Sequence, residues 1–266
     1  MIHGGAKRWT YWWPTVNPSD LFKVAKKQER FVFGFEPGRQ FLGKYVVISL
    51  LGAGWEGEVY HVREIATGIE RAAKFFYPHR NPRDRAINFY AKKLNKLRHC
   101  PILIQYHTHE VVRYRRQDIK FLVSEYVEGI LLREFVRRQP DKRLSAFEGL
   151  HLLYALTEGL EYVHDIPDYH GDLHWGNIIV RRQGIGFDVK LVDFFHWGPP
   201  KAENIREDVI DVIRIFYDAL GGRKQYRHHP PEIKAICCGL KRSLISKKFK
   251  TAGHLRQYLE TMEWNN

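Results

Sequence analysis

Three polar residues near the middle of the chain have the types and the spacing that phosphoryl transfer requires. Asp172 is followed five positions later by Asn177, and Asp193 stands at the end of the apolar run that begins at Leu191. Carboxylate and amide oxygens suit Mg²⁺, and an acid beside a bound nucleotide can orient a hydroxyl group for attack on phosphorus. These residues, on loops after short predicted strands, therefore predict magnesium- and nucleotide-dependent transfer chemistry.

A glycine-rich segment precedes this group in the sequence. Gly52, Gly54 and Gly57 lie between two predicted strands. A lone Gly-x-Gly-x-x-Gly pattern is weak evidence, and its place between strands argues against a dinucleotide-binding fold, whose glycine motif opens a helix. The position is typical of a loop that folds over nucleotide phosphates, where side chains would block close approach of the backbone.

The first part of the chain has the pattern of a small sheet with one helix. Asn81 and Pro82 are good residues for a helix start, and Ile87, Tyr90 and Leu94 fall on one helical face after them. Turn residues separate apolar and β-branched runs around this helix. The predicted strands are 45–51, 59–62, 71–77, 105–114 and 119–125.

After Gly129 the pattern becomes helical. Gly221 and Gly222 end one apolar helix in the way that glycine commonly ends helices. Two short strands, 178–180 and 189–192, follow the polar run: Asn177 directly precedes the first strand, and Asp193 directly follows the second. The predicted helices are 131–138, 145–164, 207–220, 231–244 and 251–261.

The composition indicates a folded protein with a basic surface. Forty-three Lys and Arg against thirty Asp and Glu leave a net charge of +13, which is compatible with a solvated surface, nucleic acid or an anionic membrane. The cysteines are three, an odd count, two of them adjacent and none in a Cys-x-x-Cys pattern. A structural zinc site or a disulfide framework is therefore not expected, which favours a cytoplasmic location. The N-terminus lacks a secretory apolar core, and no apolar run is long enough for a transmembrane segment.

Residues 1–38 differ from the rest and predict an N-terminal aromatic-rich extension. A helix is expected from Ser19, and an apolar stretch ends at Pro37-Gly38. We expect the extension to pack on the main domain, because so many exposed aromatics would be a liability; docking of a partner is the alternative. Its aromatic residues are Trp9, Tyr11, Trp12, Trp13, Phe31, Phe33 and Phe35.

The run from Tyr169 to Asn177, the Asp193-Phe pair and the Ala-Ala-Lys74 strand resemble the catalytic loop, metal-binding element and lysine strand of the protein-kinase superfamily. The similarity is to eukaryotic-like Ser/Thr protein kinases and covers residues 40–262 with the elements in the family's order. It implies an α+β, two-lobed fold. The N-lobe (39–128) would hold an antiparallel five-stranded sheet and one helix, and the C-lobe (129–266) would be mainly helical.

The resemblance assigns catalytic roles to three residues. Asp172 matches the catalytic base, and Lys74 matches the lysine that reaches the α- and β-phosphates of ATP. His174 stands where many protein kinases carry a lysine directed at the γ-phosphate. Asn177 and Asp193 match the two ligands of Mg²⁺.

The same resemblance assigns an ATP-binding set and a supporting set. The backbones of Glu125 and Val127 would bind adenine, while His170 and Phe194 would pack the lobes together and Asp208 would cap the catalytic loop. Ser124 would be a small residue at the back of the pocket. The ATP-binding set comprises Gly52, Gly54, Gly57, Val59, Ala72, Lys74, Glu125, Val127 and Ile179.

Three departures from the family pattern matter. Gly171 replaces the arginine that often precedes the catalytic acid, so regulation by activation-loop phosphorylation is not expected. The segment from Asp193 to Asp208 is short, lacks Ala-Pro-Glu and has Phe195 in place of the glycine of Asp-Phe-Gly. Peptide docking is therefore expected to differ from that of typical protein kinases.

The third departure concerns the partner of Lys74. The first helix lacks the expected glutamate, because Tyr90 lies one turn before Leu94 and Asp84 is the only acid nearby. Asp84, another acid or Asp193 could serve Lys74, or the pair could be absent.

These features leave three functional hypotheses. The first is an ATP- and Mg²⁺-dependent serine/threonine protein kinase that acts on a protein substrate, with itself as one candidate. The second is a kinase of a small molecule or sugar, similar to aminoglycoside or lipopolysaccharide kinases. The third is a nucleotide-binding pseudokinase, motivated by the missing glutamate.

Overall fold

A computed structural model of the chain describes residues 31–193 and 199–263. The chain divides into two compact units, residues 1–33 and 34–266. In the first unit the rings of Phe31 and Phe33 meet edge to face, with centroids 5.0 Å apart. The aromatic cluster at residues 9–13 and the helix predicted from Ser19 lie outside the described residues. The predicted domain boundaries stay predictions.

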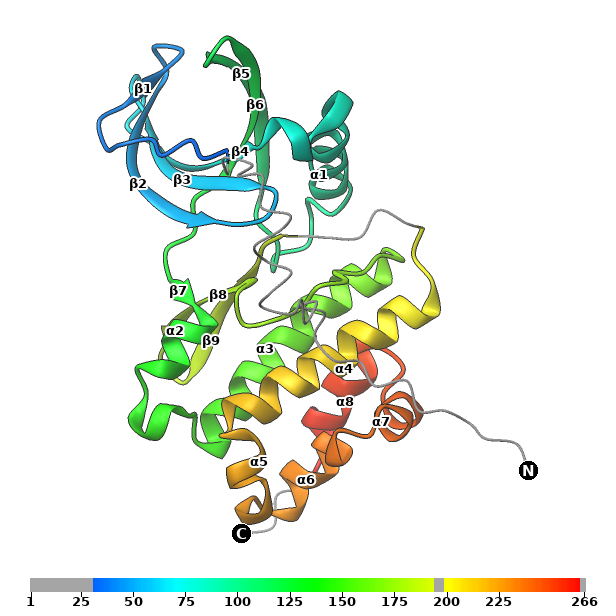
Figure 1. The fold of residues 1–266 in the computed structure, drawn as a ribbon. Coiled ribbons are helices and arrows are strands. Elements are labelled where there is room, and N and C mark those ends of the chain that lie inside the picture. Colours follow the sequence, from blue (N-terminus) through cyan, green and yellow to red (C-terminus); the bar gives the residue numbers. More distant parts are fainter. Residues whose placement is uncertain (1–30, 194–198, 264–266) are drawn as a thin grey trace, which may run out of the picture. The chain divides into compact units, whose positions relative to one another are not determined.

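The first half of the second unit is an antiparallel sheet with one helix beside it (Figure 1). The five predicted strands are present, and a two-residue strand at the edge, which pairs Gln40 with Val46, makes the sheet six-stranded. The order is β1-β2-β3-β4-β6-β5. The bounds are β1 (Gln40–Phe41), β2 (Tyr45–Ala53), β3 (Gly57–Glu64), β4 (Glu70–Phe76), β5 (Tyr106–Tyr114) and β6 (Gln117–Glu125).

Aromatic side chains fill one face of this sheet. Phe75 of β4 stacks on Phe121 of β6 with ring centroids 4.4 Å apart, and Phe35 packs edge to face on Phe41 and Phe75. All four are buried. Burial of large aromatic surfaces is strongly stabilising, so this cluster holds the strands of the sheet together.

Helix α1 (Arg85–Lys96) buries Ile87, Tyr90 and Leu94, the face that the sequence predicted. Its predicted start is wrong, however, because residues 82–84 form a 3₁₀ turn, η2 (Pro82–Asp84), in which Arg83 has φ 53°. Asn81 still satisfies the helix N-terminus, because its Oδ1 accepts hydrogen bonds from the amides of Ala86 (3.1 Å) and Ile87 (3.3 Å).

The second half contains a small sheet and the helices. The three strands, in the order β7-β8-β9, are β7 (Ile130–Leu131), β8 (Ile178–Gln183) and β9 (Gly186–Leu191). The α-helices are α2 (Leu132–Arg137), α3 (Ala146–Asp165), α4 (Ala202–Ala219), α5 (Gly222–Gln225), α6 (Pro231–Cys237), α7 (Arg242–Lys248) and α8 (Ala252–Thr261). The remaining 3₁₀ turns are η1 (Pro78–Arg80), η3 (Pro140–Lys142), η4 (Tyr226–His228) and η5 (Cys238–Leu240).

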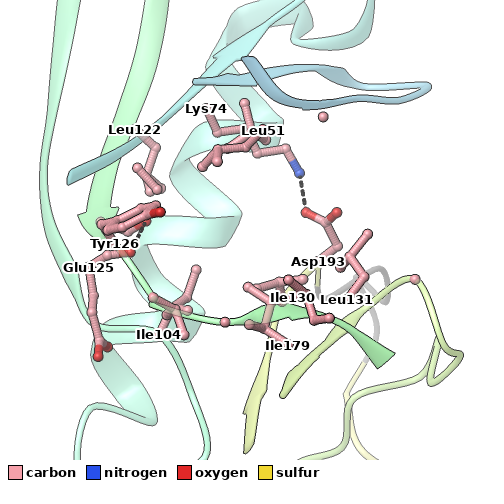
Figure 2. A pocket seen from close by; sticks show the side chains of 18 of the residues that line it. Leu51, Lys74, Ile104, Leu122, Glu125, Tyr126, Ile130, Leu131, Ile179 and Asp193 are labelled. Carbon is pink, nitrogen blue, oxygen red and sulfur yellow. Dashed lines mark hydrogen bonds and ion pairs between the residues drawn. The ribbon is translucent and has the colours of Figure 1, made fainter. Parts of the chain in front are cut away.

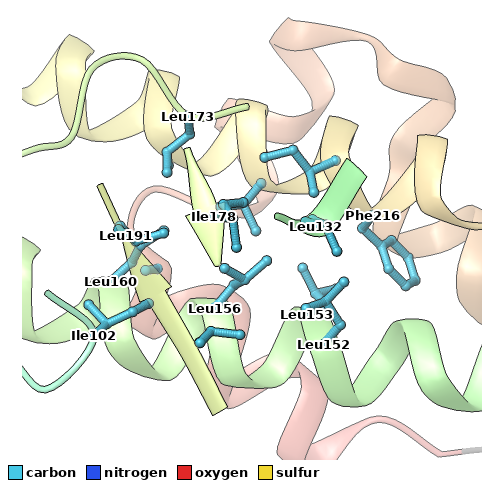
Figure 3. Close-up of a cluster of buried hydrophobic side chains, with 14 of the residues drawn as sticks. Ile102, Leu132, Leu152, Leu153, Leu156, Leu160, Leu173, Ile178, Leu191 and Phe216 are labelled. Carbon is cyan, nitrogen blue, oxygen red and sulfur yellow. The ribbon is translucent and has the colours of Figure 1, made fainter. Parts of the chain in front are cut away.

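Helix α3 is the centre of this half. A capping box of Ser145 and Glu148 begins it, and its apolar face packs against α4, α8 and β9. Figure 3 shows Leu173, Ile178 and Leu191, which flank the polar loop, over the leucines of α3. Leu173 is buried although it directly follows Asp172. The buried side chain of Leu173 therefore anchors the predicted catalytic loop to the core.

Two helix boundaries differ from the prediction. The single helix predicted over 231–244 is broken into α6 and α7, because Cys238, Gly239 and Leu240 take left-handed conformations with φ between 49° and 59°. Helix α4 begins at Ala202, before the predicted residue 207, and ends at the predicted place, where Gly221 has φ 98°. Within the described residues no helix has the length and apolarity needed to cross a membrane.

Candidate active site

A cavity of about 420 Å³ lies between the two lobes (Figure 2). Val59 of β3 and Ala72 of β4 line it from the large sheet, and Ile179 of β8 lines it from the small one. Leu51 and Leu131 extend these apolar walls. Ligand pockets of this kind are mostly apolar with a few polar groups that orient the ligand. The structure thus brings together three residues of the predicted ATP-binding set.

The segment that joins the lobes lines the same cavity with Glu125, Tyr126 and Val127. The Glu125 amide donates to the carbonyl of Gln105 (2.8 Å), and its carboxylate forms an ion pair with Lys190 (3.2 Å). Figure 2 shows this carboxylate turned away from the cavity. The Glu125 side chain therefore anchors the segment, and the backbone groups of Glu125 and Val127 are left to bind an adenine ring.

The glycine-rich turn contributes less directly than predicted. Gly52 lines the cavity, whereas Gly54 and Gly57 are not among its lining residues. The amide of Gly54 donates to the carbonyl of Gly57 (2.9 Å) and closes the turn. A Cβ atom at Gly57 would lie 1.9 Å from the carbonyl oxygen of Phe75. Gly57 is thus required by the close approach of β3 to β4, and this contact explains it without a phosphate.

Lys74 of β4 is the centre of a polar network at the inner end of the cavity. Its Nζ donates to Asp193 Oδ1 (2.8 Å), Glu56 Oε2 (2.9 Å) and the hydroxyl of Tyr90 (3.1 Å). The Tyr90 hydroxyl donates in turn to Glu56 Oε2 (2.8 Å). Burial opposes the charged ammonium, but Asp193, Tyr90 and Glu56 outweigh it and raise the pKa of Lys74.

Asp193 is held in its ionised form by the same network. Desolvation opposes ionisation, but the ammonium of Lys74 lowers the pKa of Asp193 below its usual value. Asp193 is half exposed and takes a left-handed conformation with φ 58°. A charged carboxylate is therefore presented at the cavity, as a metal ligand requires.

The acid that the first helix lacks is supplied by the glycine-rich turn. Asp84, one of the alternatives considered, pairs with Lys120 (2.7 Å), and Tyr90 occupies the predicted place of the helix acid. Glu56 was missed in the sequence because it lies in the turn, far from the helix in which a partner was sought. The available signal was the presence of an acid inside a glycine-rich turn.

Asp172, His174 and Asn177 lie together on the loop before β8. Asn177 Nδ2 donates to the carbonyl oxygen of Asp172 (2.9 Å) and approaches its carboxylate (3.4 Å). His174 Nε2 lies 3.6 Å from Asp172 Oδ2. The carboxylate of Asp172 is 46% exposed, so it faces solvent, where an acceptor hydroxyl could reach it.

The donor set fits a magnesium ion. Because the side-chain Nδ2 of Asn177 donates to Asp172, the side-chain oxygen Oδ1 is left to serve as a metal ligand. The amide of Val192 donates to the carbonyl of Asn177 (3.0 Å), which ties Asn177 to the residue before Asp193. Within residues 31–193 and 199–263 no group of three His, Cys, Asp or Glu could hold a metal by itself. Two oxygen ligands suit Mg²⁺, which retains waters and binds phosphates.

Helix α4 fixes the backbone of the loop that carries Asp172. Asp208 is fully buried and accepts hydrogen bonds from the amides of His170 (2.7 Å) and Gly171 (2.9 Å), which confirms its predicted capping role. His170 Nε2 donates to the carbonyl of Val192 (3.0 Å), and burial lowers the pKa of His170. Gly171 has φ 84°, a conformation that disfavours an arginine. His170 is therefore structural; Phe194, its predicted partner, lies outside the described residues.

Asp211, one turn after Asp208, predicts an unusual pH dependence of stability. Burial raises its pKa to about 7; Arg214 opposes this, while Asp208 and Glu207 add to it. A carboxyl with a raised pKa binds more protons in the folded state, so the free energy of unfolding falls as pH rises from about 4 to about 7. Asp211→Asn should remove this fall and increase stability by about 1–2 kcal/mol above neutral pH.

Denaturant unfolding at about pH 5 and about pH 8 measures this effect. Asp188→Asn, which changes a partly exposed acid on β9, is the control and should leave the pH dependence unchanged. An Asp211→Asn protein with the pH slope of the unmodified protein would show that Asp211 is ionised normally.

The two-lobed arrangement and the cavity between the lobes define the class of protein, and comparison with known proteins agrees. The family model described as "Protein kinase domain" matches residues 45–198, more than half of the chain. The chain therefore belongs to the protein kinase domain family.

Individual relatives are similar over more than half of the chain. Serine/threonine-protein kinase PrkC of Bacillus subtilis is 27% identical over 160 residues, which are 59% of this chain and 23% of the relative. CBL-interacting protein kinase 17 of Oryza sativa is 34% identical over 166 residues, 59% of this chain and 33% of the relative. The chain thus spans a third or less of the length of these relatives.

A solved structure shares the fold. The kinase domain of Mycobacterium tuberculosis PknI, crystallised as a point mutant, superposes with a TM-score of 0.59 and 20% identity, covering 85% of this chain and 98% of that one. This similarity confirms the predicted α+β kinase fold. Helix α4 begins at Ala202 and includes Asp208, so the last part of the short segment from Asp193 to Asp208 is helical.

Proposed function

We propose that the chain is an ATP- and Mg²⁺-dependent protein kinase that transfers phosphate to serine or threonine hydroxyls of a protein substrate, itself included. The observation that carries this proposal is the network of Lys74 and Asp193 at one apolar cavity, with Asp172 and Asn177 on the loop tied to it. PrkC is named a serine/threonine-protein kinase and the Oryza relative a protein kinase, which favours protein over small-molecule acceptors.

Each residue would contribute positioning or charge. Val59, Ala72 and Ile179 would enclose adenine, and the backbones of Glu125 and Val127 would set its orientation. Lys74 would bind the α- and β-phosphates, while Asp193 and Asn177 would hold Mg²⁺, which neutralises phosphate charge when it is bound. Asp172 would accept the proton of the attacking hydroxyl, and His174 beside it would face the transferred phosphate.

The pseudokinase hypothesis loses its main motivation. It rested on the absence of an acid for Lys74, and Glu56 now occupies that position in the network. The small-molecule hypothesis still rests on the short segment after Asp193. A nucleic-acid or membrane partner rests on the net charge of +13 alone. A cytoplasmic location rests on Cys100, Cys237 and Cys238, all of which are free.

The test is incubation with γ-labelled ATP, Mg²⁺ and a set of protein acceptors, followed by identification of the labelled amino acid. Label on serine or threonine supports the proposal. Label on a sugar or antibiotic and never on protein would replace it with the small-molecule hypothesis. Binding of ATP without turnover across a broad acceptor panel would favour the pseudokinase.

A further inference from the structure

We propose that Glu56 and Tyr90 are the positioning residues of Lys74, so that the glycine-rich turn, and not helix α1, supplies the carboxylate that holds the phosphate-binding lysine. This inference rests on the proposed function and extends it to two residues that no family motif assigns. It is carried by the contacts of Lys74, by the anchoring of Glu56 and by the anchoring of α1.

The first argument is the need of Lys74 for a second acid. Its side chain is 13% exposed and that of Glu56 is 12% exposed, so the pair is largely removed from water. A buried ammonium without a partner is strongly unfavourable. Asp193, its other carboxylate partner, is also the predicted metal ligand and cannot be reserved for the lysine. Glu56 keeps Lys74 charged and oriented while Asp193 serves both the lysine and the metal ion.

The second argument is the way in which Tyr90 completes the contact. Its hydroxyl accepts from Lys74 (3.1 Å) and donates to Glu56 (2.8 Å), and Lys74 Nζ also lies 4.2 Å from the centroid of its ring. Tyr90 therefore orients the carboxylate and shields the ion pair. The helix thus carries an aromatic residue, Tyr90, where an acid was expected, and the acid, Glu56, lies in the glycine-rich turn.

The third argument is that Glu56 is held in place through its backbone. Its carbonyl accepts a hydrogen bond from the amide of Tyr77 (2.9 Å), directly after β4. The neighbouring Trp55 lies under the guanidinium of Arg80, 3.6 Å from the ring centroid. The turn is thus fastened to the chain that follows the lysine strand, which gives the Glu56 carboxylate a defined position.

The fourth argument is that α1 is fixed to the catalytic loop. Lys93 Nζ donates to the carbonyl of Tyr169 (2.7 Å) and pairs with Asp168 (3.2 Å), and Lys96 also pairs with Asp168 (2.7 Å). Tyr90 lies one turn before Lys93 on this helix. The helix therefore places the Tyr90 hydroxyl relative to the loop that carries Asp172, and both lobes contribute to the position of Lys74.

Binding measurements test the inference without requiring phosphoryl transfer. The affinities of ATP and of adenosine are measured by calorimetry in the presence of Mg²⁺ for the unmodified protein, Glu56→Gln, Tyr90→Phe and the double variant. Glu56→Gln should weaken ATP about tenfold and leave adenosine within about twofold, because only ATP has phosphates for Lys74 to bind. Tyr90→Phe should weaken ATP about threefold.

The double variant should lose less ATP affinity than the two single losses combined, because Lys74, Glu56 and Tyr90 contact one another and their effects are coupled. Glu110→Gln is the matched control. It removes a carboxylate of the N-lobe that pairs with Lys44 (2.6 Å) and lies outside the cavity lining. It should leave both affinities unchanged.

Three outcomes would overturn the inference. Equal loss of ATP and adenosine affinity would show a structural role for Glu56, and tighter binding of ATP would show that its carboxylate competes with phosphate. Unchanged ATP binding in Glu56→Gln would show that Lys74 needs no acid from the turn. If the unmodified protein bound no ATP, the proposed function itself would fail, and that result is distinct from all three.

Discussion

Replacing Asp172 with alanine should reduce phosphoryl transfer by about a thousandfold or more and leave the affinity for ATP within about twofold. Asp172 is not among the lining residues of the cavity, and its carboxylate is 46% exposed. Asn177 bonds chiefly to the backbone carbonyl of Asp172, a contact that alanine preserves. The loss should therefore fall on proton acceptance and hydroxyl orientation and spare the nucleotide pocket.

The measurement compares the rate of label transfer from γ-labelled ATP with the dissociation constant for ATP in the same preparation. Asp188→Ala on β9 serves as the control, since it removes a partly exposed acid that pairs with Arg181 (3.1 Å). Transfer at an undiminished rate by the Asp172 variant would refute its role as the catalytic base. A parallel loss of ATP affinity would instead indicate that the loop had rearranged.

Replacing Asp193 with alanine should have a second large effect, which includes binding. Asp193 lines the cavity and pairs with Lys74 at 2.8 Å, so the change removes a predicted Mg²⁺ ligand and one of the two carboxylates of the lysine network. We expect ATP to bind about tenfold or more weakly in the presence of Mg²⁺, with transfer reduced by at least about a thousandfold. Adenosine should bind as before.

Titration of ATP at several magnesium concentrations separates the two contributions of Asp193. If it binds the metal, the difference between variant and unmodified protein should shrink when magnesium is withheld. A difference that is the same with and without magnesium would show that Asp193 acts only on Lys74. Thermal unfolding without ligand should change little, because Glu56 remains as a partner of the buried ammonium.

Much of the fold could be predicted because it depends on local patterns. Apolar and β-branched runs separated by turn residues predicted the five long strands, and the spacing of Ile87, Tyr90 and Leu94 predicted the buried face of α1. The helical spacing of apolar residues also predicted α3. Errors arose where left-handed residues interrupted a helical pattern, as at Cys238–Leu240 between α6 and α7, because side-chain periodicity continues across such a break.

The sequence by itself determined which groups are available for chemistry and in what order they occur. The spacing of Asp172, Asn177 and Asp193 around two short strands brings them to one edge of the small sheet, since β8 and β9 pair directly from Ile178 to Leu191. Asp208 could also be assigned to the loop, and the structure confirms its hydrogen bonds.

Only the tertiary structure decided which acid serves Lys74. Glu56, Lys74 and Tyr90 come from a turn, a strand and a helix, and their contact depends on the approach of β3 to β4 and on the ties of α1 to the catalytic loop. No local periodicity encodes such a contact, because it arises when elements distant in sequence pack together. A buried ammonium must then be paired by whichever carboxylate that packing brings within reach.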